Sequence, residues 1–223
     1  MENSRIKWIG FDLDGTLVNT AGDIAHAVNN MLKRLELNSV TVGQVETWIG
    51  NGIEKTTERA LTQVKAQYID VKLATAYVIE EYNRCVTNQS RLYPNVVATL
   101  EKLKILGLKL ALVTNKDKQH TLAITRHLNI YHYFDSIVCS NDDTGHKKPH
   151  PEPLLAALRT MDVTIDEGCY VGDSINDVKT ARNAGCKVIT VDYGYNHGVP
   201  IALAEPDRII GDLAELQSIF RAG

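Results

Sequence analysis

The feature that most constrains the fold is a series of short apolar segments, each followed by a stretch with helical periodicity. Segments of this kind are typical of buried strands, and regular alternation of strand and helix indicates parallel pairing. The strands are expected at residues 8–11, 108–113, 137–139, 169–171 and 187–191. The sequence therefore predicts an α/β fold, a Rossmann-like parallel sheet core with helices on both faces.

The alternation stops between the first and second predicted strands. Residues 71–86 support one helix, and apolar residues at helical spacing support another: Ile24, Val28, Met31, Leu32 and Leu35. We therefore expect an inserted all-α helical cap domain at 20–88, with the catalytic core formed by 1–19 and 89–223. Because the insert begins at the strand end where sites of such sheets form, it is placed to act as a lid.

Composition excludes several classes of function. The 223 residues carry a formal charge of only −3, with no long block of like charge, so neither nucleic acid nor an anionic membrane is an expected partner. No apolar stretch is typical of a signal peptide or a membrane span, and a cytoplasmic location is expected. The four cysteines show no close metal or redox spacing and are interpreted as buried thiols.

Polar side chains follow four of the predicted strands. The first strand runs into Asp12 and Asp14, two residues apart, followed by Gly15 and Thr16. Strand periodicity places both carboxylates on one side if the backbone stays extended. The other strand ends carry further candidate residues: Thr114 and Asn115, then Lys147 and Lys148, and then Asp173, Ser174 and Asp177.

Each of these residues also has a purely structural interpretation. An Asp-Gly pair is common in turns, and Thr114 and Asn115 could cap a helix beginning near Lys116. Ser174 and Asp177 match a capping box, and a lysine alone is usually a surface residue. Four such signals at four successive strand ends favour the functional interpretation, because each stands where this fold places catalytic groups.

In order and spacing, these motifs resemble those of the haloacid dehalogenase superfamily of phosphotransferases. The resemblance implies a phosphatase that depends on Mg²⁺. A phosphate monoester dianion repels an attacking carboxylate until its charge is neutralised, and carboxylate oxygens are ligands that Mg²⁺ prefers. Asp12 and Asp173 are the expected ligands with Asp177 in support, and the resemblance adds the backbone carbonyl of Asp14.

The same residue types fit the steps of phosphoryl transfer. Asp12 is the expected nucleophile, forming an aspartyl phosphate, and Asp14 the expected general acid and base. Lys148 would bring positive charge to the phosphoryl oxygens, and the Thr114 hydroxyl and Asn115 backbone amide would donate hydrogen bonds to them. Supporting roles fall to Ser174 and Asp177, whereas Lys147 is interpreted as a solvated neighbour.

Three further segments resemble the phosphoglycolate phosphatase family within this superfamily: residues 48–52, 147–153 and 192–196. That resemblance implies hydrolysis of 2-phosphoglycolate to glycolate and phosphate. In the cap, Gly50, Asn51 and Gly52 could present backbone amides to the substrate carboxylate. Two alternatives remain: the turn never touches substrate, or Lys55 or Arg59 meets the carboxylate instead.

Other functions stay open at this point. A related phosphatase or a phosphomutase acting on another small phosphate ester or sugar phosphate would keep the same motifs. A catalytically silent phosphate-binding module is the alternative outside enzymes, since a fold alone does not determine function. Asp14 disfavours a hydrolytic dehalogenase, whose chemistry needs no acid at that position. The expected partner is a small phosphate ester, and the protein is expected to be a monomer or homodimer.

Overall fold

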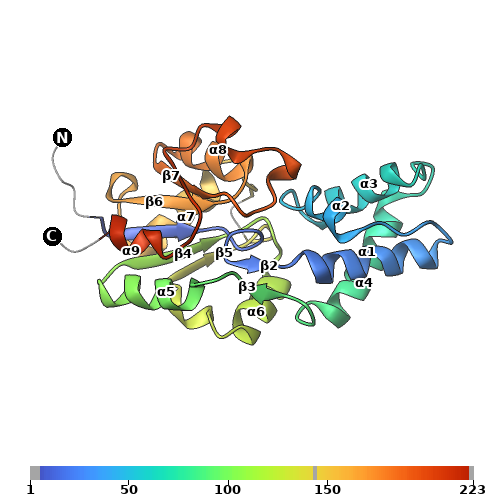
Figure 1. Ribbon diagram of the computed structural model, residues 1–223, viewed down its shortest axis with the longest axis horizontal. Coiled ribbons are helices and arrows are strands. Elements are labelled where there is room, and N and C mark those ends of the chain that lie inside the picture. The colour runs from blue at the N-terminus through green and yellow to red at the C-terminus, as the bar shows by residue number, and fades with distance from the viewer. Residues whose placement is uncertain (1–5, 143–144, 221–223) are drawn as a thin grey trace.

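Parallel strands form the central sheet of the computed structural model, which describes residues 6–142 and 145–220 (Figure 1). The ends of the predicted core, 1–5 and 221–223, lie outside the described residues. Within the described part, six strands run in the order β5 (Ser136–Val138), β4 (Lys109–Val113), β1 (Trp8–Phe11), β6 (Gly168–Gly172), β7 (Lys187–Val191) and β8 (Arg208–Ile210).

The central position of β1 determines where the polar strand ends meet. Phe11 pairs with Leu112 on one side and with Val171 on the other, both in parallel register. The residues that follow these three strands therefore emerge next to one another. This point, where the chain order reverses on either side of β1, is where ligands bind in open α/β sheets.

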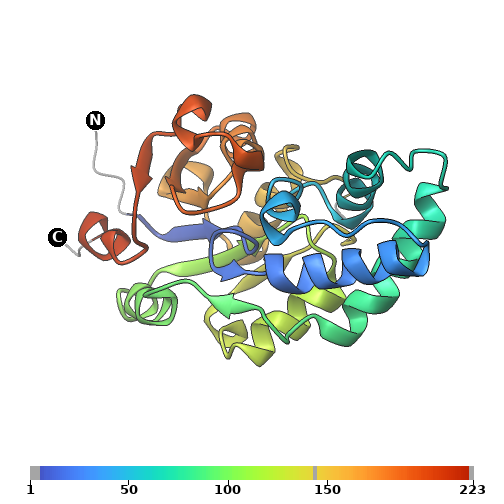
Figure 2. The ribbon, with the colours of Figure 1, turned by 45° about the vertical axis from the view of Figure 1, so that its right-hand side comes forward.

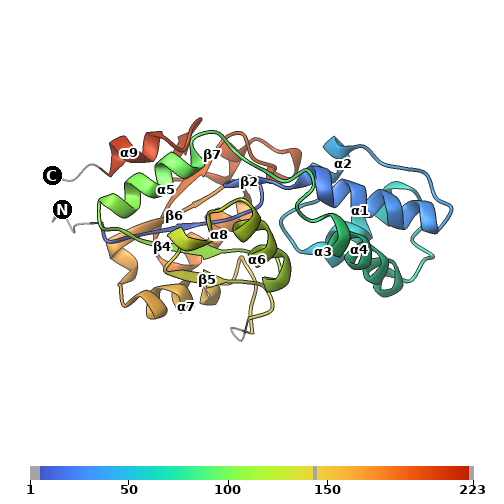
Figure 3. The same cartoon turned by 90° about the horizontal axis from the view of Figure 1, so that it is seen from below.

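Alternate residues of the strands pack on opposite faces of the sheet. Ile9 and Phe11 belong to a core that includes residues of α5 (Val96–Ile105), α6 (Lys118–His127) and α9 (Glu215–Ile219). Trp8 belongs to a second core with residues of α7 (Glu152–Met161) and α8 (Ile175–Ala184). Figure 3 shows α5 and α9 above the sheet and α7 below it. The strands are thus apolar on both faces because helices cover both.

Four helices follow the first strand and lie beyond the carboxyl ends of the sheet (Figures 1 and 2). They are α1 (Ala21–Arg34), α2 (Val42–Glu46), α3 (Ile53–Gln63) and α4 (Val71–Cys85). Of the predicted apolar stripe, Ile24, Val28, Met31 and Leu32 are buried in α1. The chain leaves the core for these helices and returns to it through a short antiparallel pair of strands, β2 (Val18–Asn19) and β3 (Arg91–Leu92).

The predicted α/β fold is confirmed, and all five predicted strands form within one residue of their expected bounds. The sequence pattern did not reveal β8, because only three residues pair there and two of them are exposed at the sheet edge. Nor did it reveal β2 and β3, which are two residues long. The four cysteines are free and buried, as expected.

In the part of the chain described, no helix combines the length and the apolar character needed to cross a membrane.

Candidate active site

Asp12 and Asp14 stand at the floor of a cavity between the sheet and the four helices that follow β1. The Asp12 amide donates to the Val171 carbonyl oxygen at 2.9 Å, so the chain is still paired with β6 there. The cavity has a volume of about 640 Å³ and is lined by residues of the core and by residues of α1, α3 and α4. Both carboxylates line it, as the strand periodicity predicted.

Lys148 joins the two carboxylates that stand farthest apart in the sequence. Its Nζ lies 2.8 Å from Asp12 Oδ1 and 2.7 Å from Asp177 Oδ1, and it donates to the Tyr170 hydroxyl at 3.1 Å. Only 5% of Lys148 is exposed. A buried ammonium group with two carboxylate partners stays charged, so this lysine is a fixed cation beside Asp12.

Three buried carboxylates converge at Asp12, which lines the cavity. One oxygen each of Asp12, Asp173 and Asp177 lies within 4.8 Å of the others, and all three residues are buried. The Lys148 ammonium group is the ionic partner of Asp12 Oδ1. A cluster of three buried carboxylates that share one cationic neighbour fits a hard divalent cation.

The two Asp177 oxygens are already engaged. Oδ1 contacts Lys148, and Oδ2 accepts from the Ser174 amide at 3.0 Å and the Ser174 hydroxyl at 2.6 Å. The capping interpretation of Ser174 and Asp177 is therefore confirmed, at the start of α8. This structural role is compatible with the functional interpretation, since the Asp177 carboxylate also contacts Lys148.

Burial shapes the ionisation of these groups. It raises the pKa of Asp12 to about 7, and Lys148 offsets part of the effect. Burial, together with the charges of Asp177 and Asp12, raises the pKa of Asp173 well above its ordinary value. Burial alone would lower the pKa of Lys148, but Asp12 and Asp177 outweigh it and hold that pKa well above normal. The site therefore has an excess of negative charge that a cation would relieve.

Asp173 is held by groups from distant parts of the chain. The Thr16 hydroxyl donates to Oδ1 at 3.1 Å, and the Tyr195 amide donates to Oδ2 at 2.8 Å. Gly15 has a φ of +85° and approaches so closely that an added Cβ would lie 2.4 Å from Asp173 Oδ2. The segment at 192–196 thus supports the site, and the role of Tyr195 in it was not expected from the sequence.

Thr114 and Asn115 do not cap the helix that follows them. That helix, α6, begins at Lys118 with Asp117 as its N-cap, so the capping alternative is wrong. Thr114 is 4% exposed and lines the cavity. The Asn115 side chain accepts from the Lys148 amide at 2.9 Å and donates to the Lys148 carbonyl at 3.0 Å. It fixes the backbone of the lysine loop, which was not expected.

The same Asn115 side chain reaches the turn between α2 and α3. Its Nδ2 lies 3.0 Å from the Gly50 carbonyl oxygen, which also accepts from Asn176 at 3.3 Å. Gly50 and Gly52 have φ values of +115° and +89°, a backbone region that other residues rarely adopt. This turn and Asn51 line the cavity opposite the strand ends.

Lys116 is a site residue that the sequence motifs did not reveal. Its Nζ lies 3.0 Å from Asp14 Oδ2, while the Thr20 hydroxyl donates to Asp14 Oδ1 at 2.7 Å. Burial would lower the pKa of Lys116, but Asp14 outweighs it and the net shift is upward. The sequence offered one signal for this role: Lys116 is a charged residue that immediately follows the polar residues after β4. Asp14 therefore contacts both Lys116 in the core and Thr20, the N-cap residue of α1.

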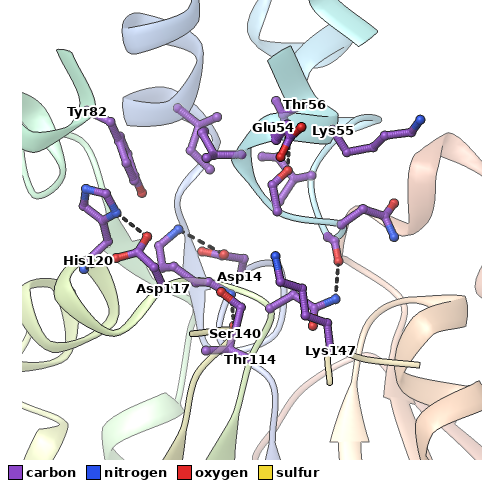
Figure 4. Close-up of a pocket in the computed structure, with 18 of the residues that line it drawn as sticks. Asp14, Glu54, Lys55, Thr56, Tyr82, Thr114, Asp117, His120, Ser140 and Lys147 are labelled. Atoms are coloured by element: carbon purple, nitrogen blue, oxygen red, sulfur yellow. Dashed lines mark hydrogen bonds and ion pairs between the residues drawn. The ribbon is translucent and has the colours of Figure 1, made fainter. Parts of the chain in front are cut away.

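A further polar group joins α4 to α6 at one wall of the cavity. His120 interacts with Asp117 through one ring nitrogen and with Asn83 Oδ1 through the other at 2.8 Å. Its ring lies 4.6 Å from that of Tyr82, as Figure 4 shows on the left. The Tyr82 hydroxyl is buried with no hydrogen-bond partner in the described chain. No motif in the sequence marks this group, since its members come from two distant helices.

Comparison with known proteins identifies the family. The chain matches the family model of haloacid dehalogenase-like hydrolases over residues 9–191. A phosphoglycolate phosphatase of Haemophilus influenzae (strain 86-028NP) is 40% identical over 98% of this chain and its own full length. One from Mannheimia succiniciproducens is 41% identical over 97% of this chain and 99% of its own.

Solved structures give the same result for the fold. A crystal structure of a predicted phosphoglycolate phosphatase from Haemophilus somnus 129pt superposes with a TM-score of 0.91 at 38% identity. The match covers 97% of this chain and 98% of that one. Together with the site geometry, these similarities show that the chain belongs to the haloacid dehalogenase-like hydrolase family.

Proposed function

We propose that this protein is a Mg²⁺-dependent phosphatase that hydrolyses 2-phosphoglycolate to glycolate and phosphate. The observation that carries the proposal is the buried Lys148 ammonium between Asp12 and Asp177, where Asp12 lines a cavity large enough for a small ester. The similarity to phosphoglycolate phosphatases along almost the whole chain supports the choice of substrate. The core would comprise 1–19 and 89–223, and the cap 20–88.

In the first half of the reaction, an Asp12 carboxylate oxygen forms a bond to phosphorus as the bond to the glycolate oxygen breaks. Asp14 donates a proton to that leaving oxygen, and Lys148, Thr114 and the Asn115 amide stabilise the charge on the phosphoryl oxygens. In the second half, Asp14 takes a proton from water, which attacks phosphorus and releases Asp12 and phosphate.

The carboxylate cluster is the proposed Mg²⁺ site. Asp12, Asp173 and the backbone carbonyl of Asp14 would hold the ion, and Asp177 and Ser174 would support it. Mg²⁺ would neutralise negative charge on the phosphate and on the attacking carboxylate. The convergence of three buried carboxylates supports this assignment. Burial, together with the charges of Asp177 and Asp12, also raises the pKa of Asp173, and a cation would relieve both effects.

The stability of the metal-free protein should fall as pH rises from about 4 to above 7. Within that window folded Asp12 keeps a proton that it loses on unfolding, because its pKa rises from 3.8 to about 7. Rising pH removes this advantage, which amounts to about 4 kcal/mol at most. Mg²⁺ binds the ionised form, so it should raise Tm more at pH 8 than at pH 5.5.

Thermal unfolding at several pH values, with and without Mg²⁺, measures this effect. The Asp12→Asn variant serves as the matched control, since it has no proton to lose at that position. It should show a flatter decline between pH 5.5 and 8 than the wild type. Equal slopes for the two proteins would show that Asp12 ionises normally.

The proposed activity predicts magnesium-dependent phosphate release with 2-phosphoglycolate as the preferred substrate among small phosphate esters and sugar phosphates. Comparable activity on larger esters would contradict the proposed substrate but not the proposed mechanism. Transfer of the phosphoryl group to a sugar instead of water would identify a phosphomutase. No release from any ester would favour a silent phosphate-binding module.

The Gly50–Gly52 turn is proposed to contact the substrate from the cap. Gly52 precedes the first residue of α3 and makes no side-chain cap, so the first-turn amides of this helix are available to an anion. In the same kinetic assay, Gly50→Val and Gly52→Val should raise KM for 2-phosphoglycolate. An unchanged KM would mean that the turn stays clear of substrate.

A further inference from the structure

Among the described residues, the cavity contains one lysine whose charge is not already neutralised. Lys55, Lys116 and Lys147 all line it. Lys55 Nζ lies 2.6 Å from Glu58, and Lys116 Nζ lies 3.0 Å from Asp14. Within residues 6–142 and 145–220, Lys147 has no carboxylate partner.

The other cation considered for substrate binding is also engaged. Arg59 donates to the Trp48 carbonyl oxygen at 2.7 Å and to Asn51 Oδ1 at 3.0 Å, so its guanidinium holds the turn that precedes α3. Figure 4 shows Lys55 extending away from Asp14, whereas Lys147 lies in the lower part of the cavity with Asp14. Neither Lys55 nor Arg59 is therefore free to take up a new anion without losing a partner.

Two observations locate Lys147 relative to the rest of the site. It directly precedes Lys148, whose amide and carbonyl are both bonded to Asn115. In addition, Lys147 Nζ lies 3.9 Å from where a Cβ on Gly52 would stand. The ammonium group of Lys147 thus lies beside the start of α3.

The charges around this point favour an anion carried by the substrate. The uncapped start of α3 adds partial positive charge to that of Lys147. Glu54 lines the same cavity and would repel a second carboxylate, and Lys147, which has no carboxylate partner among the described residues, would offset that repulsion. In 2-phosphoglycolate one methylene group separates the carboxylate from the phosphate ester oxygen. With the phosphoryl group at Lys148, the carboxylate must lie close by.

We propose that Lys147 binds the carboxylate of the substrate and is the residue that makes the site prefer phosphate esters with a neighbouring carboxylate. This inference rests on the proposed function and refines it. The two lysines then bind different groups of the substrate. Lys148 faces the phosphoryl group and Asp12, and Lys147 faces the carboxylate. The exposed Lys147, interpreted from sequence as a solvated neighbour, becomes a specificity residue.

The test compares Lys147→Gln with Lys55→Gln, which removes the same charge from a lysine that is already paired with Glu58. Each variant is assayed with 2-phosphoglycolate and with 2-hydroxyethyl phosphate, an ester of similar size without the carboxylate. Lys147→Gln should lower kcat/KM for 2-phosphoglycolate about tenfold or more, mainly through KM. It should leave 2-hydroxyethyl phosphate within about twofold, a change equivalent to less than 1 kcal/mol.

Two further variants complete the comparison. Lys55→Gln should change neither substrate by more than about twofold, as expected for an exposed ion pair. Lys147→Arg keeps the charge and should retain most of the preference for the carboxylate. Rising ionic strength should weaken the preference of the wild type more than that of Lys147→Gln.

The outcomes separate this inference from the proposed function. If the wild type strongly prefers 2-phosphoglycolate and Lys147→Gln keeps that preference, the function stands and Lys147 is not the specificity residue. An equal loss with both esters would also overturn the inference, because it would place Lys147 at the phosphoryl group. If the wild type shows no preference for the carboxylate, both the substrate assignment and the role of Lys147 are wrong.

Discussion

Replacing Asp12 with asparagine should lower kcat for 2-phosphoglycolate by about 10⁴-fold or more, because an amide cannot form the phosphoryl bond that a carboxylate forms. The same change should raise Tm of the metal-free protein above pH 7 by about 4 °C or more, since it removes a buried ionised carboxylate. Steady-state kinetics and thermal unfolding measure the two effects. A loss of activity together with a gain in stability is expected when a buried charged group serves the reaction and destabilises the folded protein.

The chemistry of the intermediate provides an independent check on Asp12. A single turnover quenched in acid should leave phosphate bound to the wild type in a form that hydroxylamine releases, as for an acyl phosphate. The Asp12→Asn variant should retain none. Phosphate bound at another residue, or full activity in the variant, would rule out Asp12 as the nucleophile.

Replacing Lys148 with methionine should reduce both activity and stability. Loss of its charge beside the phosphoryl oxygens should lower kcat/KM by about 10³-fold. The change also leaves Asp12 and Asp177 buried without their shared cation. Breaking a buried ion pair costs about 3–5 kcal/mol, so Tm should fall by about 10 °C. Unfolding and phosphate-release assays at pH 8 measure these changes.

Two controls keep the Lys148 prediction interpretable. Lys148→Arg keeps the positive charge but changes its shape, so it should recover stability more than activity. Lys102→Met removes an exposed lysine from α5 and should alter neither. A Lys148→Met protein that unfolds like the wild type would show that the two carboxylates do not depend on this lysine. If Lys148→Arg were fully active, a positive charge alone would meet the catalytic need.

The sequence by itself determined the architecture and predicted which residues would form the candidate site. Strands that are apolar on both faces demand a parallel sheet with two helical layers, and parallel strands bring their carboxyl ends to one edge. A polar residue placed directly after such a strand is therefore brought to that edge. For this reason the positions of Asp12, Thr114 and Asp173 along the chain predict one candidate site. Asp12 and Thr114 line the same cavity, and Asp173 lies in the carboxylate cluster with Asp12.

Only the tertiary structure decided which groups pair with which. The Asp14 contact with Lys116 spans 102 residues, and that of Asn115 with Gly50 spans 65. No periodicity or motif links positions so far apart, because side-chain partners depend on how helices and turns pack over the sheet. The charge state of the cavity depends on the same pairing: it neutralises Lys55 and Lys116 and leaves Lys147 with no carboxylate partner among the described residues.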